Sequence, residues 1–233
     1  MDCAQSQCGG RIVTYQVAFR GKDGIVIASD RRELQEPGLG DYGSGSRTNL
    51  VKKIHIDPSG RFAWAYAGGE VSPVAAGNVK HALESGEINS NPDIDAMLKD
   101  CGDRSWQVAR GPSANSTILF LDGSTKRMRR AKLSPMTIVE EMEGGMCMAG
   151  QTYNKASFFP EHIYAEDMSV SQLSALAAYA VRMAHEMDSL CVDGLDIAVY
   201  SDSTARFEFL DSSEYWDKSG ILDQKIRSLF IDG

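Results

Sequence analysis

The stretch TYQVAFRGKDGIVIASDRR, residues 14–32, decides the fold that the sequence predicts. Two apolar runs, 12–20 and 24–29, are separated by a short glycine-containing turn, which is typical of a β-hairpin. Thr14 stands at the head of the first strand and Asp30 ends the second. Because the strands of a hairpin are antiparallel, these two positions are expected to lie side by side at the same end of the two strands.

Beyond the hairpin, the chain alternates between strand-like and helix-like segments. The pattern predicts strands at 52–56, 61–67, 116–121, 126–133, 146–148, 196–201 and 206–210, and helices at 70–84, 92–100, 151–165, 171–187 and 212–229. This order favours an α+β fold, a four-layer αββα sandwich of two antiparallel sheets flanked by helices. Residues 36–47, rich in Gly, Ser, Pro and Asp, are expected to form a surface loop.

Composition limits the classes of protein to which the chain can belong. Its 233 residues fit one domain, 14–233, behind a polar extension, 1–13, and the net charge of −8 disfavours a nucleic-acid surface. No apolar run approaches the ~20 residues of a membrane span. Five scattered cysteines predict free thiols and a cytoplasmic protein, and four unclustered histidines predict no metal and no cofactor. The basic run 126–130 is interpreted as a solvated hairpin face, with a partner-docking patch as the alternative.

A third polar residue completes a possible nucleophile site. Lys53 opens the strand at 52–56, so its ammonium group could meet Thr14 and Asp30 at the strand ends. A threonine hydroxyl needs a base, and without a suitably placed histidine the base would be the α-amine of Thr14 itself. Gly68, before a helix N-terminus, could offer its N–H to an oxyanion. Periodicity alone leaves open an ordinary strand threonine with a solvated Asp and Lys.

Several motifs resemble those of proteasome β-type subunits, which are N-terminal-nucleophile hydrolases. The run 14–32 resembles the mature N-terminus of that family, KKIHI its catalytic-lysine segment (Lys53), and AYAGG its oxyanion-hole turn (Gly68). MAGQTYN resembles the family's GSGQT loop, and MDSLCVDGLDIAVYSD resembles the segment that carries a supporting aspartate, here Asp188. The resemblance implies a threonine endopeptidase that forms an acyl ester on Thr14. It also implies peptide or unfolded-protein substrates, a homo-oligomeric ring or stacked rings, and an ATPase or another regulator as a partner.

Three positions depart from the family pattern. Ala149 and Cys191 stand where the family has serines near the α-amine, which removes hydroxyls from the proton-transfer network. Val13 stands where self-processing members have glycine. Three outcomes for residues 1–13 stay open: autolysis after Val13, translation starting at Val13 with removal of the initiator, or a permanently blocked Thr14.

The resemblance also implies a substrate pocket. Its positions are Glu33, Val51, His55, Tyr66 and Glu70. Two carboxylates would favour a basic side chain before the scissile bond, unless Glu33 and Glu70 face solvent or a neighbouring subunit. The alternatives to a protease are a catalytically silent ring subunit and a related amidohydrolase or transpeptidase acting on one special peptide.

Overall fold

The computed structural model describes residues 14–35, 47–86, 91–109, 116–150, 155–189 and 192–231. The larger sheets each have five antiparallel strands, and a two-stranded sheet lies beside them. The first sheet has the order β10 (Met146–Gly150), β1 (Tyr15–Gly21), β2 (Gly24–Ser29), β11 (Asp196–Ser201), β12 (Arg206–Phe209). The second has the order β5 (Ile54–Ile56), β6 (Phe62–Ala67), β7 (Thr117–Asp122), β8 (Arg127–Lys132), β9 (Ile138–Glu141).

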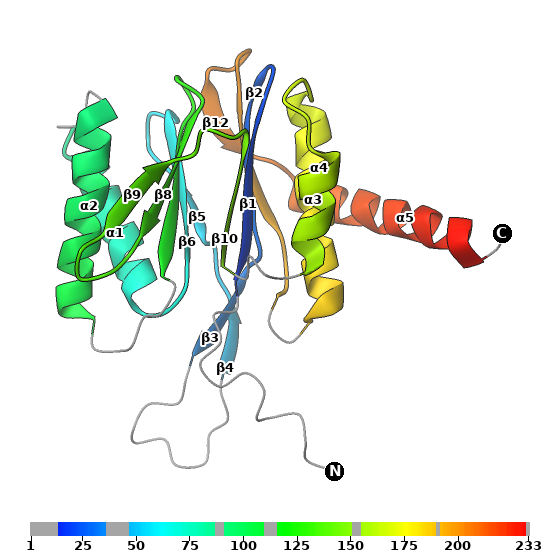
Figure 1. Cartoon of the computed structure of the whole chain (residues 1–233), viewed down its shortest axis with the longest axis horizontal. Helices are drawn as coiled ribbons and strands as arrows, with labels where there is room; N and C mark the ends of the chain where they lie inside the picture. Colours follow the sequence, from blue (N-terminus) through cyan, green and yellow to red (C-terminus); the bar gives the residue numbers. More distant parts are fainter. Residues whose placement is uncertain are drawn as a thin grey trace, which may run out of the picture.

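Helices cover the outer faces of the two five-stranded sheets (Figure 1). The chain forms α1 (Val71–Glu84), α2 (Asn91–Val108), the 3-10 turn η1 (Lys155–Ser157), α3 (Phe158–Ile163), α4 (Val170–Met187) and α5 (Ser212–Ile231). α1 and α2 lie against the second sheet, and α3 and α4 lie against the first. None of the described helices combines the length and the apolar composition that crossing a membrane requires.

Alternating side chains of β1 explain how its sheet is held from both sides. Tyr15, Val17 and Phe19 are fully buried in the apolar core that α4 covers. Ala18, pointing the other way, packs in a second core between the two sheets. A third core fills the space between the second sheet and helices α1 and α2. Because burial on both faces fixes which residues point inward, the register of the hairpin is strongly specified.

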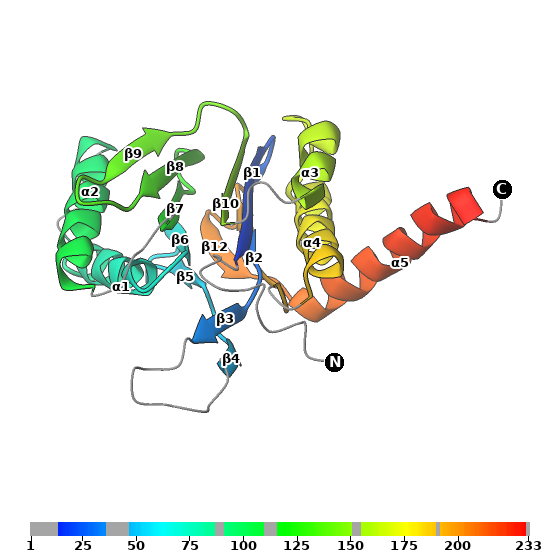
Figure 2. The same ribbon diagram turned by 60° about the horizontal axis from the view of Figure 1, so that its bottom comes forward.

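The predicted four-layer sandwich of two sheets is wrong. The described residues form three sheets, and the third pairs β3 (Arg32–Gln35) with β4 (Arg47–Leu50) (Figure 2). This ribbon forms because the chain leaves the first sheet at Asp30 and pairs locally before it enters the second. In addition, α5 does not lie flat on a sheet face but extends away from the body.

Other boundaries differ in ways that the packing explains. The helix expected at 92–100 continues to Val108, since its buried side chains extend past the predicted end to Cys101. The helix expected at 151–165 is described only as the short turn and helix from Lys155 to Ile163. Sequence periodicity missed β9, whose partly exposed apolar residues form an edge strand.

The basic run on β8 is neutralised by carboxylates. Arg129 is buried and its Nε lies 2.5 Å from Asp95 on α2, which differs from the solvated hairpin face that the sequence predicted. Arg130 pairs with Glu140 at 2.8 Å on the neighbouring strand. These ion pairs hold α2 and β9 to β8 and leave no uncompensated basic patch at these two arginines.

Candidate active site

Thr14 lies next to the ammonium group of Lys53. Lys53 Nζ donates a hydrogen bond of 2.9 Å to Thr14 Oγ1, although 39 residues separate the two in sequence. Thr14 is 7% exposed and Lys53 is 2% exposed, so this contact is made away from bulk water. The hydroxyl therefore has a positively charged neighbour in a low-dielectric environment, where such a contact affects its acidity strongly.

Asp30 holds Lys53 with both carboxylate oxygens. The Nζ–Oδ1 and Nζ–Oδ2 distances are 3.1 and 3.0 Å. The same carboxylate accepts hydrogen bonds of 2.9 Å from the backbone N–H groups of Tyr15 and Arg32. Asp30 is thus fully buried but fully engaged, as a buried carboxylate must be. The structure brings Thr14, Asp30 and Lys53 together, as the sequence predicted.

Burial shifts the protonation equilibria of this pair. Desolvation raises the pKa of Asp30 to about 6, against the opposing effects of the Lys53 charge and of its hydrogen bonds. Desolvation likewise lowers the pKa of Lys53, while Asp30 and Glu33 act in the opposite direction. A lysine with a lowered pKa exchanges its proton more readily near neutral pH, which suits it to proton transfer with the adjacent hydroxyl.

The second sheet brings Gly68 to the same end of the molecule. Ile54 pairs with Ala65 in the β5–β6 register, and continuation of that register sets Lys53 opposite Tyr66. Gly68 follows two residues later, between the end of β6 and the first turn of α1. Its φ of 111° is a conformation that favours glycine. Its role as an oxyanion donor stays a prediction.

Gln16 belongs to this site and was missed by the sequence analysis. Its side chain is completely buried, and Nε2 donates to the backbone oxygen of Tyr66 at 2.5 Å and to Ser29 Oγ at 3.3 Å. Ser29 Oγ in turn donates to the backbone oxygen of Asp30 at 2.9 Å. The sequence did carry a signal for Gln16. An amide stands at a β1 position on the same face as Ala18, and Ala18 lies in the apolar core between the sheets.

Strand β10 closes the site from the other side of β1. Gly150 pairs with Tyr15, and a Cβ at Gly150 would stand 1.8 Å from the backbone oxygen of Thr14. Ala149 pairs with Gln16 and is buried in the core between the sheets. Position 149 therefore offers the site only a methyl group, and a polar side chain faces it from the neighbouring strand.

The remaining predicted catalytic positions are less closely associated. Asp188 ends α4, where its backbone N–H donates to the carbonyls of Ala184 and His185. Its carboxylate makes no hydrogen bond or ion pair with another residue in the described ranges. Cys191 lies outside the described residues, as does the extension 1–13.

The predicted pocket residues fall into two groups. Glu33 on β3 is half-buried, and its charge acts on both Lys53 and Tyr66. His55 stacks on Tyr66 with ring centroids 6.0 Å apart, on the face of the second sheet that the third core covers. Burial, with the charges of Glu33 and Asp30, raises the pKa of Tyr66 to about 12.

The other two pocket positions lie nearer the surface. Val51 donates its N–H to the carbonyl of Arg31 at 2.7 Å, which joins the segment before Lys53 to the segment after Asp30. Glu70 is exposed at the start of α1, where its side chain makes no capping bond. Of the two predicted carboxylates, Glu33 is therefore the one whose charge acts on Lys53 and Tyr66.

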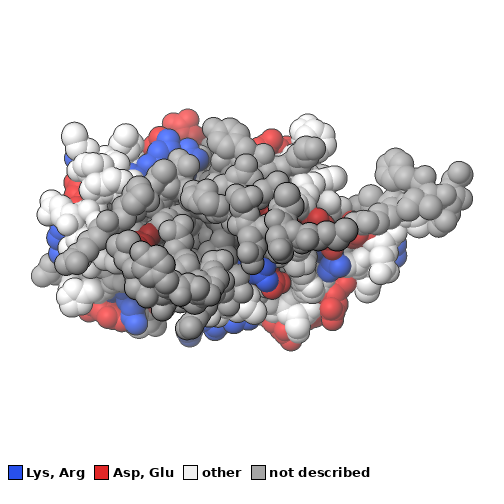
Figure 3. Space-filling model, turned by 90° about the horizontal axis from the view of Figure 1, so that it is seen from below, with Lys and Arg blue, Asp and Glu red and all other residues white. Residues whose placement is uncertain are grey.

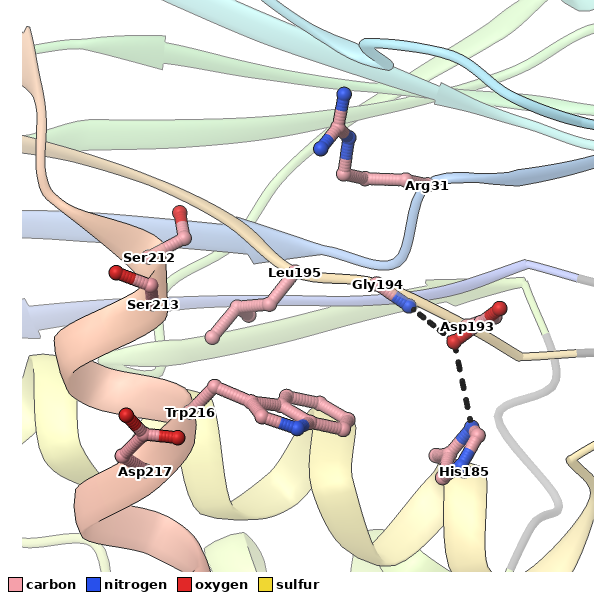
Figure 4. A pocket seen from close by; sticks show the side chains of 9 residues that line it. All are labelled: Arg31, His185, Asp193, Gly194, Leu195, Ser212, Ser213, Trp216 and Asp217. Atoms are coloured by element: carbon pink, nitrogen blue, oxygen red, sulfur yellow. Dashed lines mark hydrogen bonds and ion pairs between the residues drawn. The ribbon is translucent and has the colours of Figure 1, made fainter.

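A cavity of about 440 Å³ is lined in part by Arg31, the residue that follows Asp30 in the sequence (Figure 4). Arg31 and Trp216 lie on opposite sides of it, and His185 and Asp193 lie close together at one end. Asp193 Oδ2 pairs with Arg32 at 2.8 Å, and its backbone oxygen accepts from the N–H of Arg31 at 2.8 Å. The cavity walls thus hold the backbone that follows Asp30.

Neither the charges visible in Figure 3 nor the metal-ligating side chains of the described residues indicate a further site. Acidic and basic side chains are interspersed around the rim of the face in Figure 3. No group of three or more His, Cys, Asp or Glu side chains in the described ranges could hold a metal ion.

Comparisons with known proteins reveal similarity at the level of the fold. No family model and no curated protein matches the chain. Solved structures that match include the Anbu (Gly-1) mutant from Hyphomicrobium sp. strain MC1, at 18% identity and a TM-score of 0.69. Anbu from Yersinia bercovieri, described as an ancestral beta-subunit, matches at 15% identity and a TM-score of 0.68. Each match covers 93% of this chain and 96% of the other.

These findings correct the predicted family. The chain was expected to be a proteasome β-type subunit or bacterial proteasome homologue, but no family model matches, and the solved structures that it resembles include Anbu proteins. The short motifs misled because they mark strand ends and turns, which proteins of one fold share even where family assignment differs. At 15–18% identity the likeness establishes the fold alone.

Proposed function

We propose that the chain is a threonine-type peptide hydrolase whose nucleophile is Thr14 Oγ1. The observation that carries the proposal is the 2.9 Å contact between this oxygen and Lys53 Nζ, with Asp30 holding the same ammonium group. A structural ion pair would not require a hydroxyl as its third member. Here the hydroxyl lies at the beginning of a strand, where removal of residues 1–13 would leave it on the N-terminal residue.

The reaction begins with proton removal from Thr14 Oγ1. Once residues 1–13 are removed, the α-amine of Thr14 is free and its pKa of about 8 lets it accept the proton, directly or through water. Lys53 stabilises the developing alkoxide by its charge, and Asp30 keeps the ammonium group in place. Attack of the oxygen on a peptide carbonyl forms a C–O bond and an oxyanion, to which the N–H of Gly68 donates.

Collapse of the tetrahedral intermediate completes acylation. The C–N bond of the substrate breaks, the leaving amine takes the proton from the base, and Thr14 is left as an ester. Water then attacks the ester carbonyl, with the same α-amine accepting its proton. The carboxylic acid leaves as Thr14 regains its hydroxyl proton, so each cycle consumes one water molecule and restores the enzyme.

Partners are proposed on the same footing. The substrate is a peptide or an unfolded protein, and copies of the chain associate into a ring or stacked rings, served by a regulatory ATPase. Native mass spectrometry of the purified protein measures the first of these associations. A monomer at micromolar concentration contradicts self-association without affecting the assignment of the nucleophile.

The test compares the chain starting at Thr14, released from a cleavable fusion, with the chain that keeps residues 1–13. A set of fluorogenic peptides reports turnover, and intact mass identifies each N-terminus. We expect cleavage only with a free Thr14, and a loss of at least about 10³-fold in kcat for Thr14→Ala. Thr204→Ala, a change at an exposed turn, is the matched control and is expected to retain full activity.

Two results would contradict the proposal. Undiminished cleavage by Thr14→Ala would remove Thr14 as the nucleophile. Absence of turnover and of acyl-enzyme from the Thr14-starting chain would favour the competing hypothesis of a catalytically silent subunit. That hypothesis has one observation in its favour, since in the full sequence the nitrogen of Thr14 is an amide and cannot act as a base.

A further inference from the structure

We infer that Gln16 is a positioning residue that holds the Gly68 turn and Lys53 against the nucleophile strand. The inference rests on the proposed function, and it concerns a residue that the catalytic scheme above does not use. Gln16 lies two residues after Thr14 on β1, with its side chain directed between the two sheets. No other residue of the described site is hydrogen-bonded through its side chain to strands of both sheets.

The contacts of Gln16 reach the three parts of the site. Within the first sheet, Nε2 donates to Ser29 Oγ at 3.3 Å, and Ser29 immediately precedes Asp30. Across the gap between the sheets, Nε2 donates to the carbonyl of Tyr66 at 2.5 Å, two residues before Gly68. Through its own backbone Gln16 is tied to Thr14. One buried amide therefore fixes the spacing between nucleophile, carboxylate and oxyanion donor.

The surroundings explain why this contact sets a geometry rather than adding one more bond. The core between the sheets is otherwise lined by Ala, Ile, Leu and similar apolar side chains, whose contacts are non-directional. Apolar packing holds two sheets at a distance but leaves small sliding motions inexpensive. A short hydrogen bond between the sheets is directional, and in a low-dielectric core its loss is costly.

The same bond also constrains Lys53. Tyr66 lies opposite Lys53 when the β5–β6 register is continued from the Ile54–Ala65 pair. A shift of Tyr66 would therefore move Lys53 relative to Thr14 as well as Gly68. Since a misplacement of about 1 Å is enough to cost about 100-fold in rate, the loss of this single contact is expected to act on catalysis from a residue that touches no substrate.

The amide of Gln16 has a free acceptor. Oε1 is buried and accepts no hydrogen bond from any described residue. The cross-strand neighbour of Gln16 on β10 is Ala149, which stands where the family pattern has a serine. A carboxamide oxygen at this point supplies an acceptor that alanine cannot, on the wall of the site next to Thr14.

The test uses Gln16→Met, which keeps the length of the side chain and removes the donor. We expect kcat to fall about 10- to 100-fold, with KM changed less than about threefold. Affinity for a peptide aldehyde, whose adduct with Thr14 places an oxygen at the oxyanion position, is expected to fall in parallel with kcat. Affinity for the cleaved product peptide is expected to stay within about threefold.

Hydrogen exchange of the full chain provides a measurement that needs no activity. The amides of Ala67, Gly68 and Gly69 are expected to exchange at least about tenfold faster in Gln16→Met, while those of the β7 centre stay unchanged. Gln107→Met, the same substitution at an exposed position on α2, is the control and changes neither exchange at the turn nor kcat. If Gln16→Met does not fold, Gln16→Asn retains the amide but is one methylene too short to reach Tyr66.

The outcomes separate the inference from the proposed function. A variant with a lowered melting temperature but unchanged kcat, aldehyde affinity and exchange at 67–69 would show that Gln16 is structural only, and would overturn the inference. Absence of turnover by the Thr14-starting chain without any substitution would refute the proposed function instead. In that case faster exchange at 67–69 still supports the positioning role, and unchanged exchange refutes it.

Discussion

Replacement of Lys53 by methionine tests how much the ion pair between Lys53 and Asp30 contributes to stability. The substitution keeps a side chain of similar length in a position that is 2% exposed, and it removes the cation that both oxygens of Asp30 contact. Asp30 then keeps only the two backbone donors, Tyr15 and Arg32. Breaking a buried ion pair by removing one partner typically costs about 3–5 kcal/mol.

The loss of unfolding free energy in Lys53→Met must depend on pH, because protonation of Asp30 removes its unpaired charge. Its folded pKa, raised from 3.8 to about 6 by burial, corresponds to about 3 kcal/mol of preference for the neutral form. A raised folded pKa means that stability is full below about pH 3.8 and is lost as pH rises through the folded value. Removing the Lys53 charge, which lowers this pKa, moves the folded value still higher.

Urea denaturation of the wild type and of Lys53→Met at pH 5 and pH 8 checks this reasoning. The difference in unfolding free energy is expected to be about 3–5 kcal/mol at pH 8 and about 1–2 kcal/mol at pH 5, where mainly the hydrogen bonds are lost. Lys52→Met removes the same charge at an exposed neighbouring position and is expected to cost less than about 1 kcal/mol at either pH. Equal destabilisation of Lys53→Met at the two pH values would refute the pairing argument.

Three further predictions concern activity, backbone geometry and specificity. In a pH profile at constant ionic strength, kcat/KM is expected to fall about tenfold per unit below about pH 8, as the α-amine of Thr14 is protonated, and about 100-fold per unit below about pH 6, where Asp30 also takes up a proton and releases Lys53. A slope that stays unchanged through pH 6 would contradict the role of Asp30. Gly150→Ala should lower the free energy of unfolding, measured by chemical denaturation, by about 2–4 kcal/mol, because the φ of Gly150 is 84° and the added Cβ would meet the Thr14 carbonyl. The control Gly77→Ala, in α1, adds a Cβ into open space and should stabilise the protein by about 0.5–1 kcal/mol. Glu33→Gln is expected to reduce the preference for arginine over leucine before the scissile bond about five- to tenfold, measured as the ratio of kcat/KM for matched peptides. The same change at the exposed Glu70 should alter this ratio less than twofold. An unchanged ratio for Glu33→Gln would exclude Glu33 from the pocket.

The local parts of the site could be predicted from sequence. The hairpin that carries Thr14 and Asp30 has continuous apolar runs and a short turn, so its two strands pair with each other whatever the rest of the chain does. The β11 strand, Asp196–Ser201, has the predicted bounds for the same reason. The sequence also placed Lys53 at the opening of the next strand, and motif resemblance then assigned it the role of the catalytic lysine; it lies in contact with both residues.

The larger organisation could not be read in the same way. The pairing of β3 with β4 joins segments on either side of residues 36–46, which lie outside the described residues, and the polar composition of 36–47 indicated no strand. The direction of α5, which extends from the body, is not encoded in its helical periodicity. Family assignment failed because short motifs report strand ends and turns, whereas the whole chain is only 15–18% identical to the solved structures that share its fold.

By itself, the sequence determined which residues carry reactive groups and that Thr14 and Asp30 lie at the same end of two paired strands. Only the tertiary structure decided that Lys53 reaches both, that Gln16 links β1 to Tyr66 50 residues away, and that Ala149 faces an amide. The physical reason is that the pairing of neighbouring strands follows from the local pattern of apolar residues and turns, while the contact between two sheets depends on the packing of their side chains. A single glutamine among apolar neighbours has no periodic signature, yet its hydrogen bond fixes how the two sheets meet.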